Sequence, residues 1–319
     1  MNERIRGVLA PVVTPFKPDL SPDPERLIGH CKWLLSQKCG LAVFGTNSEA
    51  NSMSAEERMT LLDALVAAGV YPARMMPGTG CCSISETVEL TAHAVKHGCA
   101  GVLMLPPFYY KNISEEGLYR YFSEVVQRVG DPRLKIYLYH IPPVAVVGIT
   151  PKLVERLLKA YPNAIAGMKD SSGDWNNTKT FLDAFAESAR PARTGFDVFV
   201  GSESFLLANM RNGGAGTISA TANVNPAAIY ELYTGASAVP ADVDLEPQQA
   251  GLDVVRDVFS STKFPSLIAA LKQAIAIYGN DPEWARVRPP LVELTSAQAK
   301  LLAAELKAVG FAMNGIGRD

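Results

Sequence analysis

Apolar runs of strand length recur along the chain at intervals of roughly 25 to 35 residues. Within each run the apolar residues are consecutive rather than alternate, which is typical of strands buried on both faces of a parallel sheet. Eight such runs are present: Gly7–Thr14, Leu41–Gly45, Arg74–Gly78, Gly101–Leu105, Lys135–His140, Ala164–Lys169, Asp197–Gly201 and Gly216–Ala220.

The segments between these runs carry apolar residues at helical spacing, for example at Glu25–Leu35, Ala55–Ala67, Ser85–Val95, Glu115–Val129, Pro151–Ala160 and Ser204–Arg211. Eight strands alternating with helices predict an α/β fold, a TIM (β/α)8 barrel with a C-terminal helical extension. A doubly wound open sheet is the alternative. It is disfavoured because no GxGxxG motif follows the first run, where Thr14-Pro15-Phe16 forms a proline turn.

About a hundred residues follow the eighth run, and their pattern is helical. Helices are predicted at Pro226–Leu232, Gln248–Val258, Pro265–Ile277 and Ser296–Ala308, with Thr295-Ser296 as a plausible cap of the last. Gly235–Pro247 is the loosest stretch, but no low-complexity linker separates the two parts. We therefore expect residues 1–225 to form the barrel and residues 226–319 to form a helical region packed on it.

Composition narrows the classes of function. The chain has 319 residues, 19% of them charged, and a formal net charge of -2, so electrostatics favours neither nucleic acid nor an anionic membrane. The N-terminus lacks the apolar core of a signal peptide, and no run is long enough to span a bilayer. The five cysteines include no CxxC pair, as in reduced compartments. These features predict a cytoplasmic protein.

Lys169 ends the apolar run Ala164-Ile165-Ala166-Gly167-Met168. An amine that is buried without a partner is costly as an ammonium, and a lysine that gives up its proton is a nucleophile suited to Schiff-base chemistry. The alternative is a strand that simply ends there, with Lys169 solvated and Asp170 as its partner.

In a barrel, the residues that do chemistry gather at the carboxyl ends of the strands. Those positions hold one lysine, several tyrosines and hydroxyls, and only one histidine, a set that favours covalent amine chemistry and predicts no metal and no cofactor. The relevant residues are Thr46, Asn47, Tyr109, Tyr139, His140, Lys169, Gly201, Glu203 and Ile218.

At these residues the chain resembles the dihydrodipicolinate synthase and N-acetylneuraminate lyase family of class I pyruvate-dependent aldolases. The resemblance rests on four segments in the same order and at similar spacing, and it extends over nearly the whole chain. These segments are Gly45-Thr46-Asn47-Ser48-Glu49, Pro107-Phe108-Tyr109-Tyr110 with Glu116-Gly117-Leu118, Tyr139-His140-Ile141-Pro142, and Gly167-Met168-Lys169-Asp170.

The resemblance implies a role for each matching residue. Lys169 would form the imine with pyruvate or another 2-oxo acid, and Tyr139 would be the proton shuttle, with a structural strand tyrosine as the alternative. Thr46 would link Tyr139 into a hydroxyl relay, and the amides of Thr46 and Asn47 would bind the substrate carboxylate. Tyr109 would reach into a neighbouring subunit, which implies a dimer or a dimer of dimers, that is, a homotetramer. Simple aromatic packing is the alternative for Tyr109.

Departures from the family pattern bear on the substrate. Dihydrodipicolinate synthases carry two threonines in the glycine turn and an arginine after the YxxP segment, whereas this chain has Asn47 and no arginine in Pro143–Gly148. The pattern therefore favours an aldolase for a hydroxy-2-oxo acid or a 2-oxo-3-deoxy sugar acid. Gly201, Glu203 and Ile218 are expected to line the substrate site, although Glu203 could instead cap the helix that follows.

Three alternatives remain open: a dehydratase for a 2-oxo-3-deoxy sugar acid, a dihydrodipicolinate synthase (4-hydroxy-tetrahydrodipicolinate synthase), and a non-enzymatic sensor or scaffold that binds a 2-oxo acid. In each aldolase hypothesis, the small-molecule partner is pyruvate or another 2-oxo acid. The intact set of lysine, tyrosine and threonine argues against the sensor, because a binding module needs no nucleophile.

Overall fold

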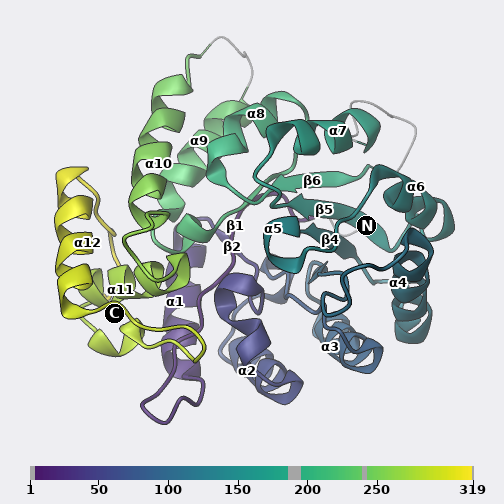
Figure 1. Ribbon diagram of the computed structural model, residues 1–319, viewed down its shortest axis with the longest axis horizontal. Helices are drawn as coiled ribbons and strands as arrows, with labels where there is room; N and C mark the ends of the chain where they lie inside the picture. The colour runs from purple at the N-terminus through teal and green to yellow at the C-terminus, as the bar shows by residue number, and fades with distance from the viewer. Residues whose placement is uncertain (1–3, 186–194, 239–242, 318–319) are drawn as a thin grey trace. The chain divides into compact units, whose positions relative to one another are not determined.

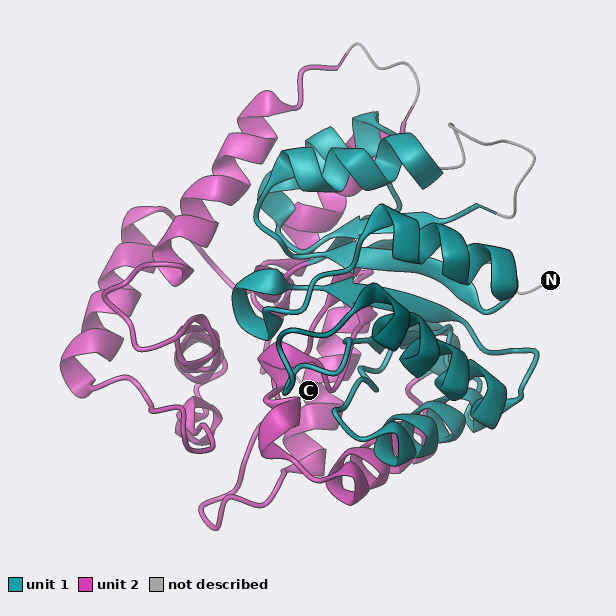
Figure 2. Ribbon diagram, turned by 45° about the vertical axis from the view of Figure 1, so that its right-hand side comes forward, with its two compact units in different colours: residues 1–7, 71–218 teal, residues 8–70, 219–319 magenta. Residues whose placement is uncertain are grey.

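The computed structural model describes residues 4–185, 195–238 and 243–317. Two segments named in the sequence analysis lie partly outside the described residues. They are residues 1–3 of the N-terminal segment, where no signal peptide is predicted, and residues 239–242 of the predicted loop Gly235–Pro247. The chain forms two compact units, coloured separately in Figure 2. Unit 1 comprises residues 1–7 and 71–218, and unit 2 comprises residues 8–70 and 219–319. This grouping differs from the division at residues 225 and 226, which stays a prediction.

Unit 1 is built on parallel strands that alternate with helices along the chain (Figure 1). Its strands are β3 (Val102–Met104), β4 (Ile136–His140), β5 (Ile165–Asp170), β6 (Asp197–Val200) and β7 (Gly216–Ile218). Its helices are α3 (Ile84–Lys96), α4 (Glu115–Val129), α5 (Pro142–Ala145), α6 (Pro151–Ala160), α7 (Trp175–Phe185) and α8 (Leu206–Arg211).

The strand order of unit 1 follows the chain: β3 pairs with β4, β4 with β5, β5 with β6, and β6 with β7, all in parallel. A doubly wound sheet would reverse its order at a switch point, and these five strands contain no reversal. Sequential parallel order is the arrangement of a TIM-barrel-like α/β fold, so this part of the fold prediction is confirmed.

The run Arg74–Gly78 does not form the regular strand that its apolar residues predict. A short 3-10 helix, Pro72–Arg74, takes up its first residue, and the remainder is paired with β3 through a single parallel bridge between Gly78 and Leu103. Proline provides the physical reason, because the missing N–H of Pro77 leaves only its carbonyl, which accepts from the Leu103 amide at 2.8 Å.

Unit 2 contains a parallel strand pair and six α-helices among its described residues. The strands are β1 (Gly7–Ala10, whose first residue belongs to unit 1) and β2 (Gly40–Leu41). The helices are α1 (Pro24–Ser36), α2 (Ala55–Ala67), α9 (Pro226–Ser237), α10 (Glu246–Phe259), α11 (Leu267–Tyr278) and α12 (Ser296–Ala308). The expected cap of the last helix is present, since the Thr295 hydroxyl accepts from the Gln298 amide.

The core of unit 2 is centred on α11, whose residues Ala270, Leu271, Ala274 and Ile275 are buried. Helices α10 and α12 pack against it. The helix is apolar around nearly its whole circumference, as expected of a helix buried within a core. One charged residue, Lys272, interrupts it and is fully buried.

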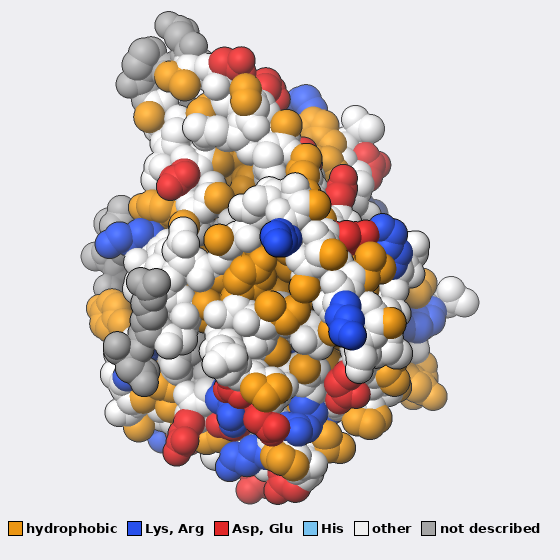
Figure 3. Space-filling view, turned by 90° about the vertical axis from the view of Figure 1, so that its left-hand side faces the viewer, with side chains coloured by type: hydrophobic (Ala, Val, Ile, Leu, Met, Phe, Trp, Pro, Cys, Tyr) orange, Lys and Arg blue, Asp and Glu red, His pale blue; other side chains and the backbone are white. Residues whose placement is uncertain are grey.

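Charged side chains of both signs are intermixed on the face seen in Figure 3, rather than gathered by sign. This distribution agrees with the small net charge and gives a polyanion no basic surface to bind on that face. Across the described ranges, every helix is too short or too polar to cross a membrane.

Candidate active site

The centre of unit 1 is a pair of side chains on neighbouring strands. Lys169 on β5 and Tyr139 on β4 are partners in the parallel ladder, so both side chains leave the sheet on the same face. Lys169 Nζ lies 3.3 Å from the Tyr139 hydroxyl and 4.4 Å from the centre of the Tyr139 ring. The sheet register alone therefore brings the predicted nucleophile to the predicted proton shuttle.

Lys169 is buried, with 2% of its surface exposed. The alternative in which it is a solvated residue at a strand end is therefore wrong. Asp170 does not act as its counter-ion either, because the Asp170 carboxylate accepts hydrogen bonds from the Ser172 amide and hydroxyl, from Asn177 Nδ2 and from the Thr178 hydroxyl. A buried amine without a carboxylate beside it, among the described residues, is suited to act as a nucleophile.

The opposite face of the same two strands carries a second ladder pair, His140 and Asp170. Since side chains alternate along a strand, these residues point away from Lys169 and toward α7, where Thr178 donates to Asp170 at 2.6 Å. His140 Nδ1 accepts from the Ile149 amide at 2.9 Å. Burial holds the pKa of His140 below its usual value, and Asp170 partly offsets this effect. The pair anchors the ends of the strands and leaves the other face to Lys169.

Tyr137 and Gly167, two residues before Tyr139 and Lys169, form the layer beneath the reactive pair. They are also close in register, and a Cβ on Gly167 would lie 2.9 Å from Tyr137 Cδ1 and 2.2 Å from the Asp197 carbonyl oxygen. Tyr137 is fully buried and packs edge to face against Phe199 of β6. Glycine is thus required here, because the tyrosine fills the space beneath the lysine.

The remaining predicted residues of unit 1 are placed differently. Gly201 follows β6, donates to the Asp170 carbonyl, and has no room for a side chain because its Cβ would lie 2.0 Å from Ser171 Oγ. Glu203 is buried at the start of a 3-10 helix, Glu203–Phe205, and Ile218 is buried at the end of β7. Tyr109 is 73% exposed and packs edge to face against Tyr110.

Thr46 and Asn47 belong to unit 2, on a single-turn 3-10 helix, Thr46–Ser48, that follows β2. The turn is held from within: Ser48 Oγ accepts from the Gly45 amide, and the Ser48 carbonyl accepts from the Thr14 hydroxyl at 2.8 Å. Thr46 and Asn47 are the first two residues of this turn, and their assignment to the substrate carboxylate is a prediction from the family pattern. The relay from Thr46 to Tyr139 stays a prediction.

The turn is also bracketed by two residues with left-handed backbones, Phe44 (φ 60°) and Glu49 (φ 57°). Non-glycine residues adopt this conformation only when their surroundings hold them there. Glu49 is buried and doubly held: its Oε1 accepts from Lys272 Nζ at 2.7 Å, and its Oε2 accepts from the Arg288 amide at 2.8 Å.

Lys272 is not predicted from the sequence as a functional residue, although it has the same pattern as Lys169, a single amine in an apolar segment. Both lysines are buried beside an aromatic ring, Tyr139 for Lys169 and Phe16 for Lys272. Only Lys272 has a carboxylate at salt-bridge distance. Burial lowers the pKa of Lys272 to about 8 against the opposing effect of Glu49. The sequence could not separate the two lysines, because the partner of Lys272 lies 223 residues away.

Comparisons with known proteins identify the family of this chain. The model of the dihydrodipicolinate synthetase family matches residues 4–309. An uncharacterized DapA-like lyase of Chloroflexus aurantiacus is 31% identical over 95% of this chain and 97% of that protein. A 4-hydroxy-tetrahydrodipicolinate synthase of Thermus thermophilus is 37% identical over 69% of this chain and 70% of that protein.

Two solved structures share the fold. Dihydrodipicolinate synthase from Agrobacterium tumefaciens is 31% identical, with a TM-score of 0.82 over 96% of this chain and 99% of that one. YagE of E. coli K12, solved in complex with pyruvate, is 26% identical, with a TM-score of 0.84 over 97% and 99%. The chain therefore belongs to the dihydrodipicolinate synthetase family, whose members are lyases that work through a lysine Schiff base, as the four sequence segments predict.

Proposed function

We propose that this protein is a Schiff-base lyase that cleaves or forms a hydroxy-2-oxo acid or a 2-oxo-3-deoxy sugar acid, with Lys169 as the nucleophile. The observation that carries the proposal is the buried Lys169 amine, 3.3 Å from the Tyr139 hydroxyl in a member of a Schiff-base lyase family. Nucleophile and proton shuttle within hydrogen-bonding reach are the arrangement that covalent catalysis by an amine requires.

The chemistry follows from these two groups. Lys169 Nζ adds to the ketone carbon of the 2-oxo acid, and loss of water leaves an iminium. In cleavage, the bond between C3 and C4 breaks, its electron pair neutralises the iminium as an enamine, and the C4 hydroxyl loses its proton as an aldehyde forms. Tyr139 is placed to accept that proton and to return one, since a phenol both donates and accepts. Protonation of the enamine at C3 and hydrolysis then release pyruvate and regenerate Lys169.

The substrate carboxylate is assigned to the amides of Thr46 and Asn47, and the polyhydroxylated tail to the residues near Gly201, Glu203 and Ile218. Two observations support an amide-lined carboxylate site: the turn is rigidly held, and left-handed residues bracket it. Thr46 would complete the relay to Tyr139. These assignments carry over the family pattern to matching positions of this chain.

A second candidate function is 4-hydroxy-tetrahydrodipicolinate synthase, the activity named for the Thermus relative. It shares the pyruvate imine and differs in its second substrate. The segment after Tyr139 weakens this candidate, because Pro142–Gly148 contains no cation for a second carboxylate. A buried carboxylate without a cation forgoes a charge-assisted hydrogen bond of about 1.5 to 3 kcal/mol. A dehydratase that uses the same imine is the third candidate.

The wider setting is part of the proposal. We place the activity in a closed (β/α)8 barrel with a C-terminal helical extension, and in a cytoplasmic homotetramer in which Tyr109 serves a neighbouring subunit. The exposure of Tyr109 supports only the contact with a neighbouring subunit, because an aromatic side chain left 73% exposed is suited to an interface.

Borohydride trapping tests the central claim. Incubation with pyruvate and borohydride should add one reduced pyruvate to Lys169, as peptide mapping would show, while Lys272 stays unmodified because Glu49 holds it. Lys169→Ala should fold normally and lose both the adduct and turnover. An adduct on Lys272, or none, would contradict the proposal. Pyruvate release measured over a panel of sugar acids separates aldolase from dehydratase, and added aspartate semialdehyde tests the synthase.

A further inference from the structure

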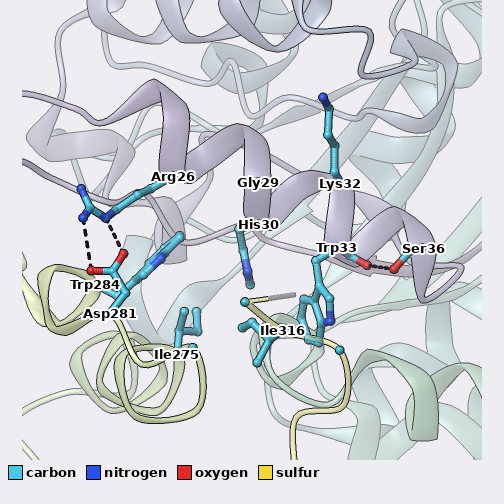
Figure 4. A pocket seen from close by; sticks show the side chains of 13 residues that line it. Arg26, Gly29, His30, Lys32, Trp33, Ser36, Ile275, Asp281, Trp284 and Ile316 are labelled. Atoms are coloured by element: carbon cyan, nitrogen blue, oxygen red, sulfur yellow. Dashed lines mark hydrogen bonds and ion pairs between the residues drawn. The ribbon is translucent and has the colours of Figure 1, made fainter. Parts of the chain in front are cut away.

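A pocket of about 440 Å³ lies within unit 2, and its lining includes none of the residues assigned to catalysis (Figure 4). Its walls come from α1, from the end of α11 and from the C-terminal loop. Trp33, Ile275, Trp284 and Ile316 supply the apolar surface. Its volume falls within the range of small-molecule sites in proteins.

Glycines give the pocket its width. Gly29, Gly279, Gly315 and Gly317 all line it, and the last two have left-handed backbones that a side chain would strain. The Trp33 indole N–H donates to the Asn314 carbonyl at 3.1 Å, which ties the C-terminal loop to α1. The loop is therefore a fixed wall of the pocket.

His30 is the polar group of this pocket, and its ring points into it between Trp284 and Trp33 (Figure 4). His30 is buried, with only 4% of its surface exposed. Neither of its ring nitrogens has a hydrogen-bond partner among the described residues. The Asn223 side chain lies near enough to raise the pKa of His30 against the larger effect of burial, but it makes no hydrogen bond to the ring and instead bonds the backbone of Val13, Pro11 and Ala220. A buried polar group left in this state is costly unless something else satisfies it.

The surroundings of His30 select an uncharged partner. Burial lowers the pKa of His30 to about 4, so at neutral pH the ring is neutral, with one donor and one acceptor nitrogen. Arg26 at the rim is bound to both Asp23 and Asp281 at 2.6 Å, and Lys32 extends away from the pocket in Figure 4. Neither cation is available to an anion inside.

We propose that this pocket binds a small, uncharged, planar heteroaromatic molecule that hydrogen-bonds to His30 and packs among Trp33, Trp284 and Ile316. The ring of His30 already stacks on Trp33, with centroids 5.5 Å apart and 23° between planes, so the site is built for flat ring systems. The N–H of such a heteroaromatic ring can donate to the bare nitrogen of the neutral imidazole.

Benzimidazole is the probe, used with the full-length protein at a pH where probe and His30 are uncharged. Titration calorimetry should give one site per chain with a dissociation constant of about 0.1 to 1 mM, as expected for a ligand of this size. 1-Methylbenzimidazole, which lacks the N–H, should bind about tenfold more weakly, the value of one hydrogen bond.

Two variants locate the site. Gly29→Phe should abolish binding, because the position faces open space at the pocket and accepts a side chain without backbone clash. Gly251→Phe on α10, equally open but outside the pocket lining, is the matched control and should bind as wild type. His30→Leu should weaken binding about tenfold. No saturable binding at about 10 mM, binding by Gly29→Phe, or equal affinity for the two probes would overturn the proposal.

Discussion

The role of each buried polar residue in this protein depends on whether its polar atoms have hydrogen-bond or ion-pair partners. Lys169 and Lys272 are both buried amines, but Glu49 pairs only with Lys272. His30 is a buried imidazole whose nitrogens lack partners among the described residues. Partner and environment, more than residue type, therefore separate the candidate nucleophile from a structural cation and from a group open to a ligand.

His30 makes stability depend on pH. Its pKa is about 4 in the folded chain and about 6.5 when unfolded, so between these values only the unfolded chain binds the proton. The stability that the folded chain gains by keeping His30 neutral is fully present above pH 6.5 and is lost as the pH falls toward 4. Urea denaturation should show a loss of about 2 kcal/mol between pH 7 and pH 5 from this residue. His30→Leu should lack that component; equal pH slopes in the two proteins would disprove it.

At the scale of elements, α11 and the turn after β2 are joined by the buried pair of Lys272 and Glu49. Each segment contains an unfavourable feature, the left-handed backbone of Glu49 in the turn and the charge of Lys272 within an apolar helix. The contact between the two residues stabilises both features. The strands of unit 1 are likewise interdependent, since the glycine of one strand leaves room for the tyrosine of its neighbour.

Removal of one member of the buried pair should be strongly destabilising. Lys272→Met leaves the Glu49 carboxylate buried with only the Arg288 amide, and should cost about 3 to 5 kcal/mol of unfolding free energy. Glu49→Gln in the same chain should recover about 1 kcal/mol or more, because the uncompensated charge disappears. Urea unfolding of the wild type, both single variants and the double variant measures this coupling. Additive costs would show that the pair is not coupled.

Gly167→Ala should disrupt the sheet of unit 1. The added Cβ would meet the Asp197 carbonyl at 2.2 Å, and backbone cannot yield there without separating β5 from β6. We expect a loss of about 3 kcal/mol or more. Gly117→Ala on α4 is the control, since its Cβ would meet only Ser114 Oγ at 3.5 Å. Thermal unfolding should place the control at or slightly above wild type; similar losses in both variants would contradict this reasoning.

At the scale of the whole molecule, the family relationship covers residues 4–309, whereas the proposed active unit includes a neighbouring subunit. Tyr109 is the residue on which the last point rests. It is exposed in the single chain and has an exposed neighbour of the same type, Tyr110, that serves as an internal comparison.

Tyr109→Phe should lower kcat at least about tenfold without changing the sedimentation coefficient, whereas Tyr110→Phe should leave kcat unchanged. Lys169→Ala chains, which are inactive, and Tyr109→Phe chains, which keep at most about a tenth of wild-type kcat, should together regain up to about a quarter of wild-type activity when refolded as a mixture, because mixed dimers contain one intact site. Failure of the mixture to regain activity, with mixed oligomers present, would show that Tyr109 does not act across subunits.

Local pattern was enough to predict most elements of this fold. Strands β3 to β7 and helices such as α6 and α12 lie where the apolar spacing places them, because burial on one or both faces imposes a short-range period. Two predicted strand runs differ: Leu41–Gly45 is strand only at Leu41, and in Arg74–Gly78 Pro77 removes a ladder hydrogen bond that apolar content alone does not reveal.

The sequence by itself determined the family and the chemical types at the strand ends, because both are encoded in contiguous segments such as Gly167-Met168-Lys169-Asp170. Only the tertiary structure decided which side chains meet. The register of β4 and β5 puts Tyr139 against Lys169 across 30 residues of chain, and Lys272 contacts Glu49 across 223 residues. Partners so distant in the chain leave no local signal, since contact between them arises only when each unit folds.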